Sequence, residues 1–445
     1  MSPFNLETCA RPNILALEPY RCARDDYKDD GTNTLLDANE NAFGPPLPTT
    51  TTTNNSNSSL PTPPNAATPL RLSTLHRYPD PHQIPLKQRL CDLRTTHTHT
   101  ARTLTPDHVF VGVGSDEAID ALLRCFCAPG RDRILVCPPT YGMYAVSAQV
   151  NDVGLVRVPL LPAEQGFQLD RAAVLDALTR DAEAAAAAAA EGRGADAVGR
   201  IKLVYLCSPG NPTGGLLRKE DVRAVLEHPT WNGVVVVDEA YVDFAEPGAS
   251  LAEWVTEWPN LAVMQTLSKA FGLAGIRLGA VFAAPPIARL LNNMKAPYNI
   301  SSLTAAVAEY ALSAEGLAAV RRTRADLIAQ RDRMVREMPK IAGVGRLRGG
   351  TDSNFLLYEM LDRDGKPDNA TALAVYERLA ENEGVVVRFR GKEHGCLGCL
   401  RITVGTEAEV TRFLAALERT LAEVRGTAPG TDEEKKEAEA SAVVA

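Results

Sequence analysis

Short apolar runs, each closed by a turn, recur along the chain and alternate with helical patterns. Runs rich in Val, Ile and Leu predict short buried strands at 108–114, 133–139, 201–214, 233–241 and 261–268. Apolar residues at helical spacing predict helices between them at 116–130 and 218–228. This alternation predicts an α/β unit whose mainly parallel sheet is covered by helices on both faces.

The pattern changes after about residue 304. A long helix is predicted over 305–338, and strands follow at 354–360, 384–390 and 399–405, with a closing helix over 406–425. We therefore expect a second, smaller α+β domain. Ligands of such folds bind beyond the carboxyl ends of the strands and between domains.

The chain accordingly divides into an N-terminal segment (1–44) expected to contribute to the small domain and the substrate pocket, a low-complexity insertion (45–69), a large domain (70–304), a small domain (305–425) and a charged tail (426–445) expected to be disordered. The insertion is rich in Pro, Thr, Asn and Ser and cannot bury enough apolar surface to order itself. A second low-complexity stretch, 181–200, is typical of a helix extended by alanines and followed by a loop. We expect these stretches to carry no chemistry.

Composition narrows the class of protein. The formal net charge of −8 argues against nucleic acid and acidic membranes as partners. The first twenty residues lack a basic start before an apolar run, and no apolar stretch reaches the length of a membrane span, so we expect a cytoplasmic protein. Nine cysteines, an odd number, favour free thiols over a disulfide framework. Neither the lone Cys396/Cys399 pair nor the "THTHT" run at 96–100 supplies four ligands, so no metal is expected.

The stretch "TLSKAFGLAGIRLG" (266–279) places Lys269 before several glycines that allow close backbone approach. A lysine that is buried loses its proton more readily and serves as a Schiff-base former or proton carrier. The alternative is a surface lysine at a helix start. Asp238 follows four valines, where a carboxylate is costly unless it meets a cation, and Tyr241 lies three residues on.

Two further turns follow predicted strands. Ser115 and Asp116 open a helix, whose free N–H groups and dipole suit a phosphate, although a simple N-cap role would explain them as well. Asn211 sits in "SPGNPTG", which is also the composition of an ordinary Asn-Pro turn. An imine-forming lysine, a buried carboxylate, a tyrosine and asparagine for a phenolic oxygen, and an anion cup would together hold pyridoxal 5′-phosphate (PLP).

The segments "SPGNPTG", "DEAYVDF" and "TLSKAFGLAGIRLG" resemble the signature of fold-type I, class II aminotransferases. More narrowly, "LLDANENAFGPP", "LHRYPDP", "CPPTYGMY" and "GCLRITVG" are similar to segments of the histidinol-phosphate aminotransferases. The resemblance covers nearly all of residues 11–425 outside the insertions. It implies the fold-type I PLP-dependent transferase architecture, with PLP as the cofactor.

The resemblance also implies a role for each matching residue. Lys269 matches the Schiff-base lysine, which also moves a proton between the substrate Cα and the cofactor. Asp238 matches the carboxylate that keeps the ring nitrogen protonated. Tyr241 and Asn211 match the partners of the phenolic oxygen, and Tyr141 matches the aromatic residue stacked on the ring. The phosphate cup would comprise Ser115, Asp116, Ser268 and Arg277.

Other matches concern the substrate and the oligomer. Arg401 matches the arginine that clamps the carboxylate of glutamate, and Arg388 matches a second arginine that joins it on the substrate phosphate; the alternative is a pair of solvated strand arginines. Tyr20 and Asn39 match positions that line the substrate pocket. Tyr78 matches a tyrosine that reaches the cofactor phosphate of the neighbouring subunit, which implies a homodimer.

The sequence therefore predicts an aminotransferase of histidine biosynthesis that uses L-histidinol phosphate and 2-oxoglutarate, with ping-pong kinetics and glutamate and imidazole acetol phosphate as products. A related PLP enzyme stays open as an alternative, either an aromatic-amino-acid aminotransferase or a decarboxylase of a phosphorylated amino acid. A PLP-binding regulatory module without turnover and a nucleotide-binding protein are weaker alternatives, because the first would not need Lys269 and the second leaves Lys269 and Asp238 without a role.

Overall fold

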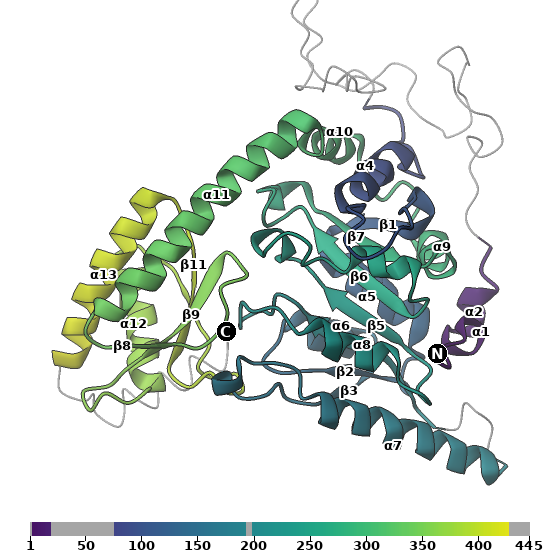
Figure 1. Cartoon of the computed structure of the whole chain (residues 1–445), viewed down its shortest axis with the longest axis horizontal. Coiled ribbons are helices and arrows are strands. Elements are labelled where there is room, and N and C mark those ends of the chain that lie inside the picture. The colour runs from purple at the N-terminus through teal and green to yellow at the C-terminus, as the bar shows by residue number, and fades with distance from the viewer. Residues whose placement is uncertain (1, 19–74, 193–197, 427–445) are drawn as a thin grey trace, which may run out of the picture. The chain divides into compact units, whose positions relative to one another are not determined.

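The computed structural model describes residues 2–18, 75–192 and 198–426 (Figure 1). The chain forms two compact units. Unit 1 comprises Met1–Ala325 with Gly350–Asn354, and unit 2 comprises Asp326–Gly349 with Phe355–Ala445. In the part of the chain that the structure describes, no single helix has the length and apolar character to cross a membrane; a pair bent by 70°, Ser302–Ala311 with Ala314–Lys340, passes that test only when joined.

Unit 1 is built on a seven-stranded sheet in the order β1-β7-β6-β5-β4-β2-β3. Its strands are β1 (Val109–Val113), β2 (Arg133–Val136), β3 (Gly154–Arg157), β4 (Ile201–Cys207), β5 (Val234–Asp238), β6 (Leu261–Thr266) and β7 (Leu278–Ala283). Only β7 runs antiparallel to its neighbours, so the sheet is mainly parallel, as predicted. The central strands are buried along their length because both of their faces carry apolar residues.

Helices cover both faces of this sheet. One face packs in a single apolar core with α1 (Leu6–Cys9), α2 (Pro12–Leu15), α5 (Gly114–Phe126), α6 (Met143–Val150) and α9 (Pro285–Met294). The other side contacts α4 (Ile84–Arg94), α8 (Lys219–Leu226) and the 3-10 turn η5 (Ala252–Thr256), and α7 (Arg171–Ala190) packs on α8. Helix α10 (Ser302–Ala311) also belongs to unit 1.

Unit 2 holds a four-stranded antiparallel sheet in the order β10-β11-β9-β8. Its strands are β8 (Val344–Leu347), β9 (Phe355–Met360), β10 (Arg388–Phe389) and β11 (Cys399–Thr403). The end of α11 (Ala314–Glu337) joins α12 (Asn369–Glu381) and α13 (Glu407–Gly426) in one apolar core with this sheet. This α+β arrangement agrees with the prediction for the end of the chain.

Two predicted elements are wrong in extent. The single helix over 305–338 is two helices, because the chain breaks at Leu312–Ser313 and the Ser313 hydroxyl accepts a hydrogen bond from the Gly316 N–H to restart it. The strand over 384–390 is reduced to Arg388–Phe389, because Gly384 turns the backbone with a positive φ of 62°. Strands β3, β7 and β8 were not predicted.

Candidate active site

Four loops of unit 1 begin where strands end at one edge of the sheet. Strands β4, β5 and β6 are mutually parallel, and β1 shares their direction because β7 runs antiparallel to both β1 and β6. Their carboxyl ends therefore lie at the same edge, where α/β proteins bind ligands. The predicted residues that follow these strands are Ser115 and Asp116 after β1, Asn211 after β4, Asp238 and Tyr241 at and after β5, and Ser268 and Lys269 after β6.

Asp238 is buried, with 3% of its surface exposed, at the end of four consecutive buried valines. One carboxylate oxygen accepts a hydrogen bond from the Tyr144 hydroxyl at 2.6 Å, and the other accepts from the Ala240 N–H at 3.1 Å. Burial raises the pKa of the Asp238 carboxyl, and the Tyr144 hydroxyl and the Lys269 charge lower it. Such a carboxylate is well suited to meet a cationic group of a ligand.

Lys269 lies near Tyr241, and its side chain is at the surface of the protein. Its Nζ is 5.6 Å from the centre of the Tyr241 ring, a cation–π geometry, and its side chain is exposed. Of the two interpretations of the sequence, a buried and a surface lysine, the exposure of the side chain agrees with the surface lysine, which lies in the loop between β6 and β7 and not at a helix start. An exposed amine at this place is accessible to a ligand bound against Asp238.

The first turn of α5 forms an anion cup with Arg277. A Cβ on Gly114 would come within 2.7 Å of Arg277 Nη2, and a Cβ on Gly279 would come within 2.5 Å of the Ser115 nitrogen. The missing side chains thus allow the guanidinium and the helix start to approach each other. Arg277 has a φ of 54°, which costs a non-glycine residue about 1 kcal/mol and is typical of functional sites. Its Nη2 lies 3.6 Å from an Asp116 carboxylate oxygen.

The two serines of the predicted cup lie in the same region. Ser115 is in the first turn of α5, where backbone N–H groups have no helical partner. The N-cap residue is Val113, so the alternative that Ser115 or Asp116 caps the helix is wrong. Ser268 Oγ lies 2.9 Å from Thr266 Oγ1, which fixes the loop at the end of β6.

Tyr141 and Asn211 complete the predicted set in unit 1. The Tyr141 hydroxyl donates to Asp116 at 3.1 Å, and its ring packs edge-on against Tyr144 at 5.6 Å between centres. Burial raises the pKa of Tyr141, which stays neutral. Asn211 is buried in a loop closed by two hydrogen bonds, from the Gly210 N–H to the Gly215 carbonyl and from the Gly214 N–H to the Gly210 carbonyl.

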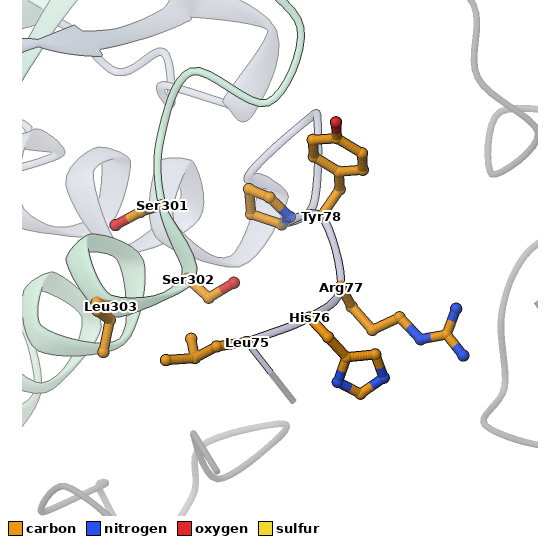
Figure 2. Close-up of a pocket in the computed structure, with 8 residues that line it drawn as sticks. Leu75, His76, Arg77, Tyr78, Ser301, Ser302 and Leu303 are labelled. Carbon is orange, nitrogen blue, oxygen red and sulfur yellow. The ribbon is translucent and has the colours of Figure 1, made fainter. Parts of the chain in front are cut away.

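Tyr78 lies in the loop that precedes α4. The ring is half exposed and stacks on Tyr298 with centres 4.6 Å apart. Beside it is an open cavity of about 350 Å³, drawn in Figure 2, whose walls come from the Leu75–Pro79 loop and from Ser301 and Leu303 at the start of α10. Tyr78 is thus available to a group from outside its own chain.

The two predicted substrate arginines belong to unit 2. In the antiparallel pair of β10 and β11, Arg388 lies directly opposite Arg401, so both side chains project from the same face of the sheet. The Arg401 guanidinium lies 5.2 Å from the centre of the Phe355 ring. Arg388 is exposed, as a solvated strand arginine would be, whereas Arg401 is only partly exposed. Tyr20 and Asn39 lie outside the described residues.

Sequence reasoning missed Tyr144, Gly114 as a contact of Arg277, and the role of Gly279 in bringing α5 to β7. Tyr144 lies in "PPTYGMY", three residues after the predicted Tyr141, so one turn of helix would have placed both rings on the same side. Gly114 and Gly279 lie in recognisable motifs, but the residues that they contact come from distant parts of the sequence.

These loops bring a cationic arginine at a helix start, a buried carboxylate and an exposed amine to one edge of the sheet. The profile of the family "Aminotransferase class I and II" matches residues 35–417. Histidinol-phosphate aminotransferase of Schizosaccharomyces pombe is 47% identical over 422 residues, which cover 94% of this chain and 98% of the relative. That of Candida maltosa is 46% identical over 425 residues, which cover 95% and 99%.

Solved structures show the same fold. Histidinol-phosphate aminotransferase from Sinorhizobium meliloti in complex with pyridoxal-5'-phosphate aligns with a TM-score of 0.64 at 24% identity, covering 79% of this chain and 84% of that chain. A mutant of aspartate aminotransferase from Thermus thermophilus aligns with a TM-score of 0.62 at 22% identity, covering 77% and 88%. The predicted fold-type I architecture is confirmed, and the chain belongs to the class I and II aminotransferases and, within them, to the histidinol-phosphate aminotransferases.

Proposed function

We propose that this aminotransferase moves the amino group of L-histidinol phosphate to 2-oxoglutarate with PLP as cofactor. The observation that carries the substrate is the register of β10 and β11, which sets Arg388 opposite Arg401. Like charges at directly opposed positions destabilise a sheet, so this pair favours an anionic ligand between them. A phosphate and a carboxylate both fit the fork of an arginine.

The residues of unit 1 fit PLP. Because Gly114 and Gly279 lack a Cβ, Arg277 lies close to the first turn of α5, and a cation beside backbone N–H groups at a helix start suits a phosphate. The buried Asp238 supplies the negative charge that a protonated ring nitrogen needs. We assign Ser115, Asp116, Ser268 and Arg277 to the phosphate, Tyr241 and Asn211 to the phenolic oxygen, and Tyr141 to the ring face.

When bound, PLP supplies a ring that stabilises negative charge at the substrate Cα. Asp238 would keep the ring nitrogen protonated through its own negative charge. Lys269 would hold the cofactor with its amine and would take the proton from the substrate Cα. Its exposed position beside Tyr241 gives the amine room for both roles. Arg388 and Arg401 orient the substrate through its phosphate, and Arg401 later orients 2-oxoglutarate through its carboxylate.

Replacement of Arg388 tests the substrate. Arg388→Ala should raise the KM for L-histidinol phosphate by about 10- to 100-fold, because one charge-assisted hydrogen bond to the phosphate is lost. The KM for glutamate in the reverse reaction should rise far less, since Arg401 still binds the carboxylate. Arg346→Ala serves as the control, because it removes an exposed arginine of β8 that pairs with Glu359 of β9. Equal losses for both substrates would contradict the proposed phosphate site.

The same assays separate the alternatives. An aromatic-amino-acid aminotransferase would turn over phenylalanine faster than L-histidinol phosphate, and a decarboxylase would release carbon dioxide from a phosphorylated amino acid. We expect neither, because an aromatic substrate would leave the second arginine without an anion.

We also propose a cytoplasmic homodimer. The half-exposed Tyr78 beside an open cavity supports a neighbouring chain at that place. The eight described cysteines are buried free thiols, which suits a reducing compartment.

The two low-complexity stretches are assigned no chemistry. The alanines of the second stretch form the end of helix α7.

A further inference from the structure

Tyr144 makes the shortest hydrogen bond to the carboxylate on which the proposed cofactor site depends. Its hydroxyl donates to Asp238 Oδ2 at 2.6 Å, across 94 residues of sequence, within the range of a charge-assisted O–H···O⁻ bond. The residue is fully buried on α6. Nothing else in the proposed mechanism uses this hydroxyl.

The ring of Tyr144 is fixed on two sides. It stacks on Tyr205 of β4 with centres 4.7 Å apart and an angle of 26°, and it meets Tyr141 edge-on. Packing of this kind fixes the ring, and its hydroxyl reaches Asp238 at the end of β5 and the Cys207 side chain on β4. With the Ala240 N–H on the other oxygen, the carboxylate of Asp238 is held at both ends.

We propose that Tyr144 is a positioning residue that keeps Asp238 ionised and aimed at the ring nitrogen of the cofactor. This inference rests on the proposed function, in which Asp238 faces that nitrogen. A hydrogen bond donated to a carboxylate favours its charged form. Without the hydroxyl, the buried carboxylate would take up a proton more readily and would lose its charge for the cofactor.

Two other charged groups act on Asp238, Asp116 on α5 and Lys269 after β6. The charge of Asp238 in turn acts on Tyr141 before α6 and on Cys207 and Tyr205 of β4. Burial raises the pKa of Tyr144, Tyr205 and Cys207, so these groups stay neutral. Asp116 raises the pKa of Asp238 and Lys269 lowers it. Since both remain in a Tyr144 variant, a change there reports the hydroxyl alone.

Tyr144→Phe and Tyr205→Phe form a matched pair. Both remove one hydroxyl from a fully buried ring of the same stack, but the Tyr205 hydroxyl donates to the Ile119 carbonyl at 3.4 Å and does not contact Asp238. The full-length chain is freed of cofactor, and its affinity for PLP is measured by fluorescence across a pH series. Asp238→Asn is measured alongside to test the placement of Asp238 itself.

Tyr144→Phe should weaken PLP binding by about tenfold at neutral pH, while Tyr205→Phe stays within about twofold. Affinity that depends on the Asp238 charge is present above the pKa of that carboxyl and is lost as the pH falls through it. The hydroxyl lowers that pKa, so its removal should move the midpoint of the loss upward by about one pH unit. In the holoenzyme, kcat should fall more than KM changes, because Arg388 and Arg401 are untouched.

Equal PLP affinity and an equal pH midpoint in the two Phe variants, with Asp238→Asn weakened, would overturn the role of Tyr144 and leave the proposed function intact. If Asp238→Asn binds PLP as the original chain does, the placement of Asp238 fails and the role of Tyr144 fails with it.

A measurement on the unaltered chain applies even if Tyr144→Phe does not fold. Acid titration of the cofactor-free protein should change a tyrosine absorbance band as Asp238 takes up its proton, and Asp238→Asn should lack that change. Identical titrations of the two proteins would contradict the proposed hydrogen bond.

Discussion

Lys269 is the residue on which the proposed chemistry depends. Lys269→Ala should abolish turnover, because neither the covalent hold on the cofactor nor the proton acceptor at the substrate Cα remains. The exposed side chain contributes little to the core, so the thermal unfolding midpoint should be unchanged. Lys340→Ala, which removes an exposed lysine paired with Glu337, should keep full activity. A Lys269 variant with near-normal turnover would exclude the mechanism.

The sequence predicts the burial of a single residue where the residue type is unusual among its neighbours. Asp238 was predicted to be buried because it directly follows four valines, and the structure confirms its burial. Tyr144 was missed because a tyrosine in an apolar helix is ordinary, and its partner is 94 residues away. The glycine-rich surroundings of Lys269 left a buried and a surface position both open, and the side chain is exposed because Gly272 and Gly275 lie in an exposed loop.

The contact between α5 and β7 decides the shape of the anion cup. A Cβ on Gly279 would lie 2.5 Å from backbone atoms of Gly114 and Ser115, so the first turn of the helix would have to move. Gly279→Ala should therefore weaken PLP binding and cost about 1–3 kcal/mol of stability. Gly275→Ala, four residues earlier in the loop before β7 and with nothing within 4 Å of its Cβ, is the matched control. Equal PLP affinity and stability in the two variants would rule out this contact as a determinant of the cup.

Helix α4 carries a buried lysine, Lys87, whose Nζ donates to Asn292 at 2.9 Å. Burial and, next, the charge of Lys295 lower the pKa of Lys87 from 10.5 to about 8. The folded chain thus binds the proton more weakly than the unfolded chain. Stability should rise as the pH increases from about 8 to 10.5, and below pH 8 the cost of the buried charge is fully present.

Lys87→Met should consequently raise the free energy of unfolding at pH 7 by about 1–2 kcal/mol, and the gain should fade between pH 8 and 10.5. Urea unfolding across that range measures the difference. A variant that is less stable than the original chain at pH 7 would show that the Asn292 contact outweighs the buried charge.

Elements were predictable where apolar periodicity was strong. The five predicted strands of the large sheet are present because their Val, Ile and Leu runs are buried on both faces. Strand β7 was missed because Gly279, Ala280 and Ala283 have low strand propensity and became a strand through pairing with β1 and β6. The break at Ser313 was invisible because the apolar spacing continues on both sides of it.

The whole molecule is proposed to work as a dimer whose sites are shared. Lys269→Ala and Tyr78→Ala should each be poorly active alone. Mixed dimers should regain one site that contains Lys269 of one chain and Tyr78 of the other, giving about a quarter of the original activity after random exchange. Activity that stays at the level of the separate variants, in a sample shown to contain mixed dimers, would place Tyr78 outside the neighbouring site.

This chain is proposed to carry out the first half of a transamination on L-histidinol phosphate. The most direct measurement is the absorbance spectrum of the purified holoenzyme before and after L-histidinol phosphate is added without a keto acid. We predict that the yellow band disappears and that 2-oxoglutarate restores it. A yellow protein whose spectrum ignores L-histidinol phosphate but responds to phenylalanine would contradict the proposed substrate.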